Sequence, residues 1–570
     1  MRGTIIAISA LSIFLFLGNI PVYSNPGKSI DEEASAALTG LLNQGFHAGS
    51  IKTLDELGLE PEDIVPWLIK VIDENEDRFL RIRACEAIAI IGSDAAEAVP
   101  VLTEILKARE VLSDWWLVKS AIDALGAIGS PAADSAGPII YEILVENADY
   151  ELYAKLPRNP DGVRSYPKGD REVFFAAYNS LKKNGVDPIS LLLNELKSVK
   201  YSLGIYDSVS GGRRARLMDT VAKFGADAVP YLREVIEQSD DYEFILNCLQ
   251  VVFKIGPDAT DLTGSLVGLY QRAKGVGSDN AGAMQASNAA ELAVSALQFI
   301  KPDPEIALPF LIELVNNQNI NISKAAIWAL GGTGDARAVP ILIRTLDDDR
   351  QYPGVTYRGG TQETIYRFIK YDAAFALGRI GPEAKEAIPK LVEMLPADEF
   401  YVPYALGSMG PDAVPAAVGV LLSDDPVARK NAARALSYMG PEAAYAVDNL
   451  ILLLKQESDM EVKDAAIHAI GSIGRAALDV CVEDPINLLI HLLDDPEGQV
   501  RESAAYSLGL FGALAEPALE KLRQLASEDE YKANNIYTVR KSAESAIERI
   551  ETNWTPKPKG AGGFRPLCPG

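Results

Sequence analysis

The sequence contains little histidine and little cysteine. Only three His and four Cys occur in 570 residues. There is no Cys-x-x-Cys pair and no Gly-x-Ser-x-Gly nucleophile elbow, so the common redox, haem-attachment and hydrolase signatures are missing. We therefore assign no catalytic, metal-ligating or cofactor-binding residues and predict a protein that is not an enzyme.

The few cysteines and histidines have ordinary explanations. Cys85 and Cys248 fall in separate helical runs many residues apart, which favours buried thiols over a disulfide. Cys568, near the end of the sequence, is the one that could cross-link. His468 and His491 fall in successive helices and could approach each other, either as a metal pair or as two ordinary surface residues.

Basic residues are also few. The chain has 54 Lys and Arg against 79 Asp and Glu, which gives a formal charge of −25 and a pI near 4.7. A nucleic-acid binder needs an excess of cations to neutralise phosphates, and an anionic membrane surface would repel this chain. We expect protein partners, no nucleic acid and no membrane binding.

Long apolar runs are missing except at the start. Residues 1–24 combine an early Arg2, an apolar run over residues 5–17, and Pro21 before a small residue at Ser24. This order predicts a secretory signal peptide cleaved after Ser24, with a retained N-terminal anchor as the alternative. The mature chain is then expected outside the cytoplasm, in a periplasm or secreted.

What the sequence does have is a repeat. Runs that end in glycine recur at Gly410, Gly440, Gly474 and Gly512, with successive spacings of 30, 34 and 38 residues. Self-similarity at this period predicts a stacked-repeat architecture. A single unit cannot bury its apolar face, whereas a stack forms a continuous core.

Each repeat is expected to be a pair of helices. In the run from Val500 to Gly512, apolar and small residues recur at helical spacing, and Gly512 occupies the position of a left-handed helix stop. Proline suits the first turn of the helix that follows a stop. We expect Pro340, Pro389, Pro415 and Pro517 to begin such helices. About thirteen pairs, each a helix A followed by a helix B, account for the chain.

The pattern resembles the HEAT repeat, including the HEAT-like form of phycobilisome lyases. The residues that carry the resemblance are the Val-Pro entries Val99-Pro100, Val229-Pro230, Val339-Pro340 and Val414-Pro415, the turn Asp424-Asp425-Pro426, and the basic residues Arg429, Lys463, Arg501 and Arg540 that open helices B. The resemblance implies an all-α, right-handed α-α superhelix with helix B on the concave side. The expected layout is a signal peptide (1–24), a helical cap (25–60) with helices near 31–43 and 51–58, the solenoid (61–552) and a disordered Pro/Gly-rich tail (553–570).

Four long insertions interrupt the repeats, at residues 149–170, 199–212, 275–287 and 350–364. Each falls between helix A and helix B of its repeat, a position that maps to one rim of a solenoid. Three of them are rich in Tyr and Arg, and Trp115 and Trp116 lie in the same turn of an earlier repeat. Tyr, Trp and Arg are the residue types that anchor protein interfaces. The alternative is that the loops fold back and pack on the adjacent repeat. The candidate partner-binding residues are Trp115, Trp116, Tyr150, Tyr153, Arg158, Arg164, Tyr166, Tyr201, Tyr206, Arg213, Arg214, Arg350, Tyr352, Tyr357, Arg358, Tyr366 and Arg367.

The function predicted from these observations is an exported, non-catalytic scaffold that binds proteins in the cell envelope. It would bind them through the concave helix B surface and the Tyr/Arg-rich rim. A basic row on helix B (Arg81, Lys370, Arg429, Lys463, Arg501 and Arg540) could contact a ligand, but pairing with the acidic turns of neighbouring repeats is the favoured role. The alternative function is a lyase-like or other enzyme-associated protein that binds a metal or small-molecule cofactor.

Overall fold

The structure of the chain is a computed structural model. It describes residues 32–45, 59–108, 114–147, 171–198, 212–276, 282–358, 361–478, 480–482, 484–532, 538–552 and 554. The expected signal peptide, the expected helix at 51–58 and nearly all of the expected tail lie outside these residues. No helix among the described residues is long and apolar enough to cross a membrane.

The described residues form thirteen successive pairs of helices, as the sequence predicts, in two compact units that divide at Ile255 and Gly256. Helix α2 (Glu32–Gln44) precedes them, at the position of the helix expected near residues 31–43. The pairs of the N-terminal unit are α4 (Pro61–Glu74) with α5 (Arg78–Ile91), α6 (Val99–Lys107) with α8 (Trp115–Ile128), α9 (Ser130–Glu146) with α11 (Arg171–Lys183), α12 (Pro188–Ser198) with α13 (Arg213–Ala222), and α14 (Val229–Gln238) with α15 (Tyr242–Ile255).

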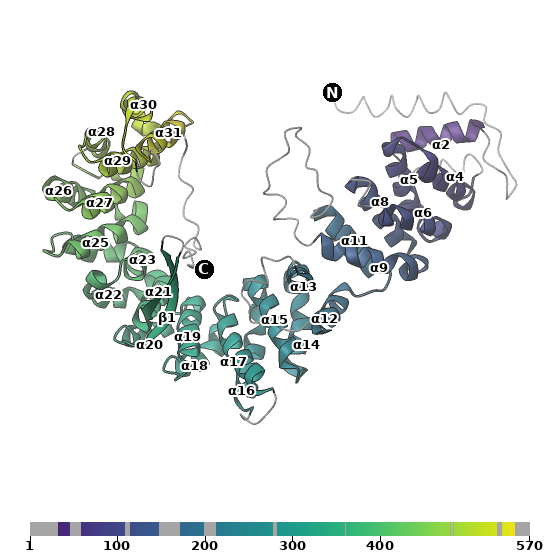
Figure 1. The fold of residues 1–570 in the computed structure, drawn as a ribbon, viewed down its shortest axis with the longest axis horizontal. Helices are drawn as coiled ribbons and strands as arrows, with labels where there is room; N and C mark the ends of the chain where they lie inside the picture. Colours follow the sequence, from purple (N-terminus) through teal and green to yellow (C-terminus); the bar gives the residue numbers. More distant parts are fainter. Residues whose placement is uncertain are drawn as a thin grey trace. The chain divides into compact units, whose positions relative to one another are not determined.

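The C-terminal unit contains eight pairs. They are α16 (Thr263–Lys274) with α17 (Ala283–Leu297), α18 (Pro304–Leu314) with α19 (Ile320–Thr333), α20 (Val339–Thr345) with α21 (Ile369–Ile380), α22 (Ile388–Met394) with α23 (Tyr401–Ser408), α24 (Val414–Val420) with α25 (Pro426–Met439), α26 (Val447–Gln456) with α27 (Met460–Ile473), α28 (Pro485–Leu492) with α29 (Gly498–Phe511), and α30 (Leu519–Glu528) with α31 (Thr538–Glu551). In this unit the helices A and the helices B form two adjacent rows (Figure 1).

Small residues let the helices B approach one another. A Cβ atom on Gly331 of α19 would lie 2.7 Å from the Cα of Ala376 on α21, and one on Gly378 would lie 2.9 Å from the Cα of Ala405 on α23. These distances are shorter than normal contact, so the helix backbones touch directly at these points. The Ala-rich composition of the helix B runs therefore sets the spacing of the stack.

Each pair is linked to the next through a sharp corner. Gly512 has φ 58° and ψ −139°, and Gly440 has φ 62° and ψ −131°. The positive φ agrees with the expected helix stop, but the negative ψ places both residues outside the left-handed helical region, in a region open mainly to glycine. The corners are therefore of two types. Gly334 (φ 66°, ψ 13°) represents the second type and has the left-handed conformation expected from the sequence.

At most corners the chain continues from the glycine directly into a 3₁₀ turn, which precedes helix A. These turns are η1 (Gly92–Ala98), η3 (Gly225–Ala228), η4 (Gly256–Leu262), η5 (Ala336–Ala338), η6 (Gly381–Ala387), η8 (Gly410–Ala413), η9 (Gly440–Ala446), η10 (Gly474–Ala477) and η11 (Gly512–Ala518), and a further one, η7 (Leu395–Ala397), follows α22.

The prolines confirm most of the expected helix starts. Pro340, Pro389 and Pro415 each stand in the first two positions of their helices A. Pro517 instead lies in η11, two residues before α30, because the 3₁₀ turn there runs on to Ala518.

One departure from the all-α prediction lies in the fourth insertion. Strands β1 (Gln351–Arg358) and β2 (Thr361–Phe368) pair antiparallel, with Gln351 opposite Phe368 and Arg358 opposite Thr361. This register leaves two residues, Gly359 and Gly360, between the strands. A Gly-Gly pair between two strand-forming runs is a hairpin signal in the sequence.

Candidate functional site

Some of the candidate rim residues lie outside the described part of the chain. For Tyr357 and Arg358 the structure gives the backbone pairing alone, opposite Gln362 and Thr361. The candidates outside the described residues are Tyr150, Tyr153, Arg158, Arg164, Tyr166, Tyr201 and Tyr206, and for these the predicted role stays a prediction.

In the N-terminal unit the tryptophan pair is exposed at the start of a helix B. Trp115 and Trp116 stack with their ring centroids 4.1 Å apart, and Trp116 is 45% exposed. On the neighbouring helix α5, Phe79 occupies the same second position and is 65% exposed. Arg78 lies over the Phe79 ring and donates to Asp114, the N-cap of α8. We call Phe79, Trp115 and Trp116 the aromatic edge.

The two candidate arginines of the second insertion are engaged within the chain. Arg213 makes paired bonds to both oxygens of Glu142 on α9 and of Glu195 on α12, at 2.6 to 3.1 Å. The bonds from Arg213 hold the pKa of Glu195 below its usual range. Arg214 donates to the buried amide oxygen of Asn247 on α15 at 2.9 Å. These contacts join successive repeats. They agree with the alternative in which the insertions pack on the adjacent repeat instead of binding a partner.

The hairpin also turns most of its described candidates inward. Arg350 donates to the carbonyl oxygens of Val315 and Asn317, in the preceding repeat. Tyr352 is 8% exposed and Tyr366, in β2, is 67% exposed. Arg367 lies opposite Tyr352 in the ladder. Of the described hairpin candidates, Tyr366 is therefore the one that is well placed for an outside contact.

The hydroxyl of Tyr352 leads to a buried carboxyl group. Asp372 on α21 is 1% exposed, and its Oδ1 accepts from Tyr352 at 3.1 Å and from the indole N–H of Trp328 at 2.7 Å. Its Oδ2 has no hydrogen-bond partner among the described residues. Burial raises the pKa of Asp372 to about 6, although these two donors, with Lys324 and Arg367 nearby, oppose the rise. Through Asp372, Tyr352 of the hairpin is therefore linked by hydrogen bonds to α21 and α19, the helices B of two repeats.

Sequence reasoning missed a row of side chains on the helices B of the C-terminal unit, all of them ring-bearing except one arginine. Each stands six residues before the glycine that ends its helix. The ring centroids of Trp328 and Phe375 are 4.8 Å apart, and those of Phe375 and Tyr404 are 5.2 Å apart. We call this row the aromatic strip. Its members are Trp328, Phe375, Tyr404, Arg434, His468 and Tyr506.

The aromatic strip continues along the later helices. Tyr438 lies 6.2 Å from Tyr404, and His468 lies 5.4 Å from Tyr506. Tyr506 is 38% exposed. The guanidinium of Arg549 lies over both Tyr506, at 5.3 Å, and Trp554, at 4.9 Å. Phe375 is buried at 3% exposure, whereas Trp328, Tyr404 and His468 are partly exposed. Partly exposed rings on adjacent helices are suited to anchor protein interfaces.

The same register has a different chemistry in the N-terminal unit. There the residues six positions before the closing glycine are acidic or polar, and two of them pair with a lysine of their own unit: Asp123 with Lys119 at 2.8 Å and Asp219 with Lys254 at 2.7 Å. The full set is Glu86, Asp123, Asn179, Asp219 and Gln250. The aromatic character therefore belongs to the C-terminal helices and does not follow from the repeat itself.

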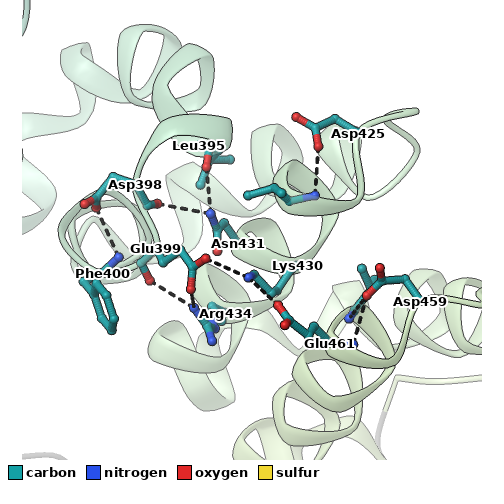
Figure 2. Close-up of polar contacts among 12 residues, drawn as sticks. Leu395, Asp398, Glu399, Phe400, Asp425, Lys430, Asn431, Arg434, Asp459 and Glu461 are labelled. Carbon is teal, nitrogen blue, oxygen red and sulfur yellow. Dashed lines mark hydrogen bonds and ion pairs between the residues drawn. The ribbon is translucent and has the colours of Figure 1, made fainter. Parts of the chain in front are cut away.

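Charged side chains near the middle of the strip connect three repeats (Figure 2). The side chain of Lys430 is 5% exposed, and its Nζ donates to Glu399 at 2.9 Å and to Glu461 at 2.7 Å. Burial alone would lower the pKa of Lys430, but the bonds to Glu461 and Glu399 raise it. Arg434 of the strip donates to the other oxygen of Glu399 at 3.1 Å.

The basic row has the role that the sequence analysis favoured. Arg429 donates to Glu457 of the next repeat at 2.7 Å, and Arg501 donates to Asp529 of the next repeat at 2.7 Å. Lys370 pairs with Asp349 in the turn before it, at 2.6 Å. Arg429 and Arg501 therefore confirm the predicted pairing with the acidic turn of a neighbouring repeat, whereas Asp349 belongs to the same repeat as Lys370.

Comparisons with known proteins agree with this architecture. The family model of HEAT repeats matches residues 285–354 and 447–547, and that of the PBS lyase HEAT-like repeat matches residues 369–395. The chain is a HEAT-repeat protein. No curated protein matches it.

Several solved structures are similar to this HEAT-repeat protein at low identity. The complex of CpcE and CpcF of phycocyanin lyase from Nostoc sp. shares 21% identity, covering 44% of this chain and 94% of that chain, with a TM-score of 0.24. Kap121p bound to Nup53p shares 11% identity, covering 92% of this chain and 52% of that chain, with a TM-score of 0.35. The Kap95:Nup1 complex shares 14% identity, covering 92% of this chain and 72% of that chain, with a TM-score of 0.38. At these values the likenesses carry no argument about function.

Proposed function

We propose that this HEAT-repeat protein is a non-catalytic scaffold that binds protein partners outside the cytoplasm. The observation that carries the proposal is the aromatic strip of the C-terminal unit, a row of side chains along consecutive helices B whose rings, except that of Phe375, are at least partly exposed. The aromatic edge of the N-terminal unit is a second contact surface. The export signal expected in residues 1–24 is the basis for the location.

The chemistry of the strip supports a peptide or protein ligand. Tyrosine and tryptophan bury large apolar areas, and their polar tips can bond to a partner backbone. Lys430 and Arg434 are already bonded to Glu399, so they add rigidity to the strip rather than a free cation. Rigid side chains on helices lose little entropy on binding, which favours affinity.

Affinity capture with matched variants tests the proposal. Mature chain is compared with a strip variant (Tyr404→Ala, Tyr506→Ala), an edge variant (Phe79→Ala, Trp116→Ala) and a control, Tyr445→Ala, which removes an 81% exposed tyrosine that belongs to neither surface. We expect a partner that is retained by the control and weakened about tenfold or more by the strip variant. Circular dichroism establishes that each variant is folded. A partner set that none of the variants alters would contradict the proposal.

A further inference from the structure

The described chain ends at the end of the aromatic strip. The backbone N–H of Trp554 donates to the backbone carbonyl oxygen of Arg549 at 2.9 Å. The guanidinium of Arg549 lies over the rings of both Trp554 and Tyr506. The sixteen residues after Trp554 therefore start next to Tyr506 of the strip. Their composition differs from that of the rest of the chain.

Residues 555–570 read TPKPKGAGGFRPLCPG. They contain Lys557, Lys559 and Arg565 and no acidic residue, although the whole chain carries a net charge of −25. They also contain four prolines and Phe564. Extended proline-rich segments dock on surfaces lined by aromatic side chains, because proline stacks on flat rings and has little conformational entropy to lose.

The strip offers charges of the opposite sign close to Trp554. Asp464 and Glu502 stand one helical turn before His468 and Tyr506, on α27 and α29. Asp464 accepts from Ser503, which holds the carboxylate of α27 against α29. Lys557 and Lys559 are three and five residues beyond Trp554, a reach of roughly 10 to 17 Å in extended chain. The first basic residues of the tail can therefore reach the first acidic residues beside the strip.

Residues 555–570 are long enough to follow the whole strip. Sixteen extended residues span roughly 50 Å. Packed helices lie about 8 to 10 Å apart, so the five steps from α29 to α19 cover about 40 to 50 Å. Phe564, ten residues beyond Trp554, reaches about 33 Å, which is three to four helices beyond α29, near Tyr404 on α23.

From these observations we infer that residues 555–570 dock in cis on the aromatic strip of the C-terminal unit. The tail covers the strip in the absence of a partner and competes with whatever binds there. The inference concerns the chain alone and does not require the proposed scaffold function, so either can fail while the other holds.

A peptide competition experiment tests the docking. The probe is a fluorescent peptide of residues 555–570 under reducing conditions, titrated by anisotropy against the full chain and against a chain truncated after Trp554, which keeps every described residue. We expect saturable binding to the truncated chain and binding weaker by about tenfold or more to the full chain, because the tethered tail competes at high effective concentration. Added salt should weaken the binding because it screens the charge pairs.

Point variants locate the site. In the truncated chain, Tyr506→Ala should weaken peptide binding by about fivefold to tenfold, whereas Tyr445→Ala should leave it unchanged. A peptide with Lys557→Glu, Lys559→Glu and Arg565→Glu should not bind. Failure of the truncated chain to bind the native peptide would overturn the inference, as would equal affinity for both chains or equal effects of the two tyrosine variants. A full chain that sediments as a dimer, and as a monomer after truncation, would overturn docking in cis.

Discussion

Lys301 is a residue whose backbone departs from the repeat pattern. It ends the weak repeat formed by α16 and α17, where other repeats have glycine, and among the described residues it is the one non-glycine with positive φ, at 52°. A side chain in this conformation costs about 1 to 2 kcal/mol. The repeat lacks the closing glycine, and the structure shows that the backbone keeps the positive φ of the corner regardless.

Replacing this residue with glycine should stabilise the protein. Lys301→Gly removes the steric cost but adds freedom to the unfolded chain, so we expect a net gain of about 1 kcal/mol in the free energy of unfolding of the C-terminal unit. The opposite kind of change at an ordinary corner, Gly440→Ala, should destabilise by about 1 to 3 kcal/mol, because the φ and ψ of Gly440 are open mainly to glycine. Denaturant unfolding of both variants measures these effects. A loss of stability in Lys301→Gly would contradict the account of the corner.

Asp372 predicts a pH dependence with a definite sign. Burial raises its pKa to about 6 from an ordinary 3.8, so between these values the native chain holds a proton that the unfolded chain has released. The stability contributed by this proton is complete below the unfolded value and is lost as pH rises through about 6. Asp372→Asn keeps the acceptor for Trp328 and Tyr352 but does not ionise.

The stability of Asp372→Asn should therefore increase relative to that of the native chain as pH rises. From about pH 4.5 to about pH 7.5, we expect the free energy of unfolding of Asp372→Asn to rise relative to that of the native chain by about 2 kcal/mol. Denaturant titrations at the two pH values measure the difference. The same difference at both values would show that Asp372 does not titrate as its surroundings require.

The connection between neighbouring repeats depends on arginines that open helices B. Arg501 donates to Asp529 at 2.7 Å and to the carbonyl oxygens of Asp495 and Pro496 at 2.8 and 2.9 Å. The side chain of Asp529 is 4% exposed. Because each repeat contacts mainly its neighbours, the loss of this residue should loosen the last pair of helices rather than the whole stack.

Hydrogen exchange measures this loosening. Arg501→Ala leaves a buried carboxylate without its cation, and we expect the amides of α31 to exchange about thirtyfold faster, which corresponds to about 2 kcal/mol. Arg501→Lys should recover part of the loss, because one ammonium cannot reach all three acceptors. Arg523→Ala is the control: its pair with Glu551 is more than half exposed on the arginine side, at 59%, and should matter little. Unchanged exchange in Arg501→Ala would contradict the role of this clamp.

Much of this element-level structure could be predicted from sequence. Regular spacing between glycines and the Val-Pro entries is enough to place the helical pairs, because each signal acts locally on the backbone. The contacts of Arg213 could not be predicted in the same way, because they depend on which repeats meet in space. The hairpin, by contrast, has a local signal in the Gly-Gly pair between its strands. The aromatic strip is visible in the sequence once residues are counted back from each closing glycine, but the exposure of its rings follows from the stacking.

At the scale of the whole molecule, the two units present different chemistry in the same helical register. The N-terminal unit has acidic and amide side chains there, and the C-terminal unit has Trp328, Tyr404, Tyr506 and the other members of the strip. A repeat stack needs only small and apolar residues inside, so the outward positions are free to vary. Rings at these positions are costly to leave in water, which is why we assign partner binding to this surface.

Site-specific photo-crosslinking from the strip tests this central claim most directly. A photoreactive phenylalanine analogue is placed at Tyr506 in one chain and at the exposed Tyr445 in another, and each is irradiated in envelope extract and in a parallel sample of the purified chain. Our account predicts one dominant protein adduct from position 506 and none from position 445. Equal labelling from both positions, or labelling from 445 alone, would contradict the assignment of the aromatic strip as the binding surface.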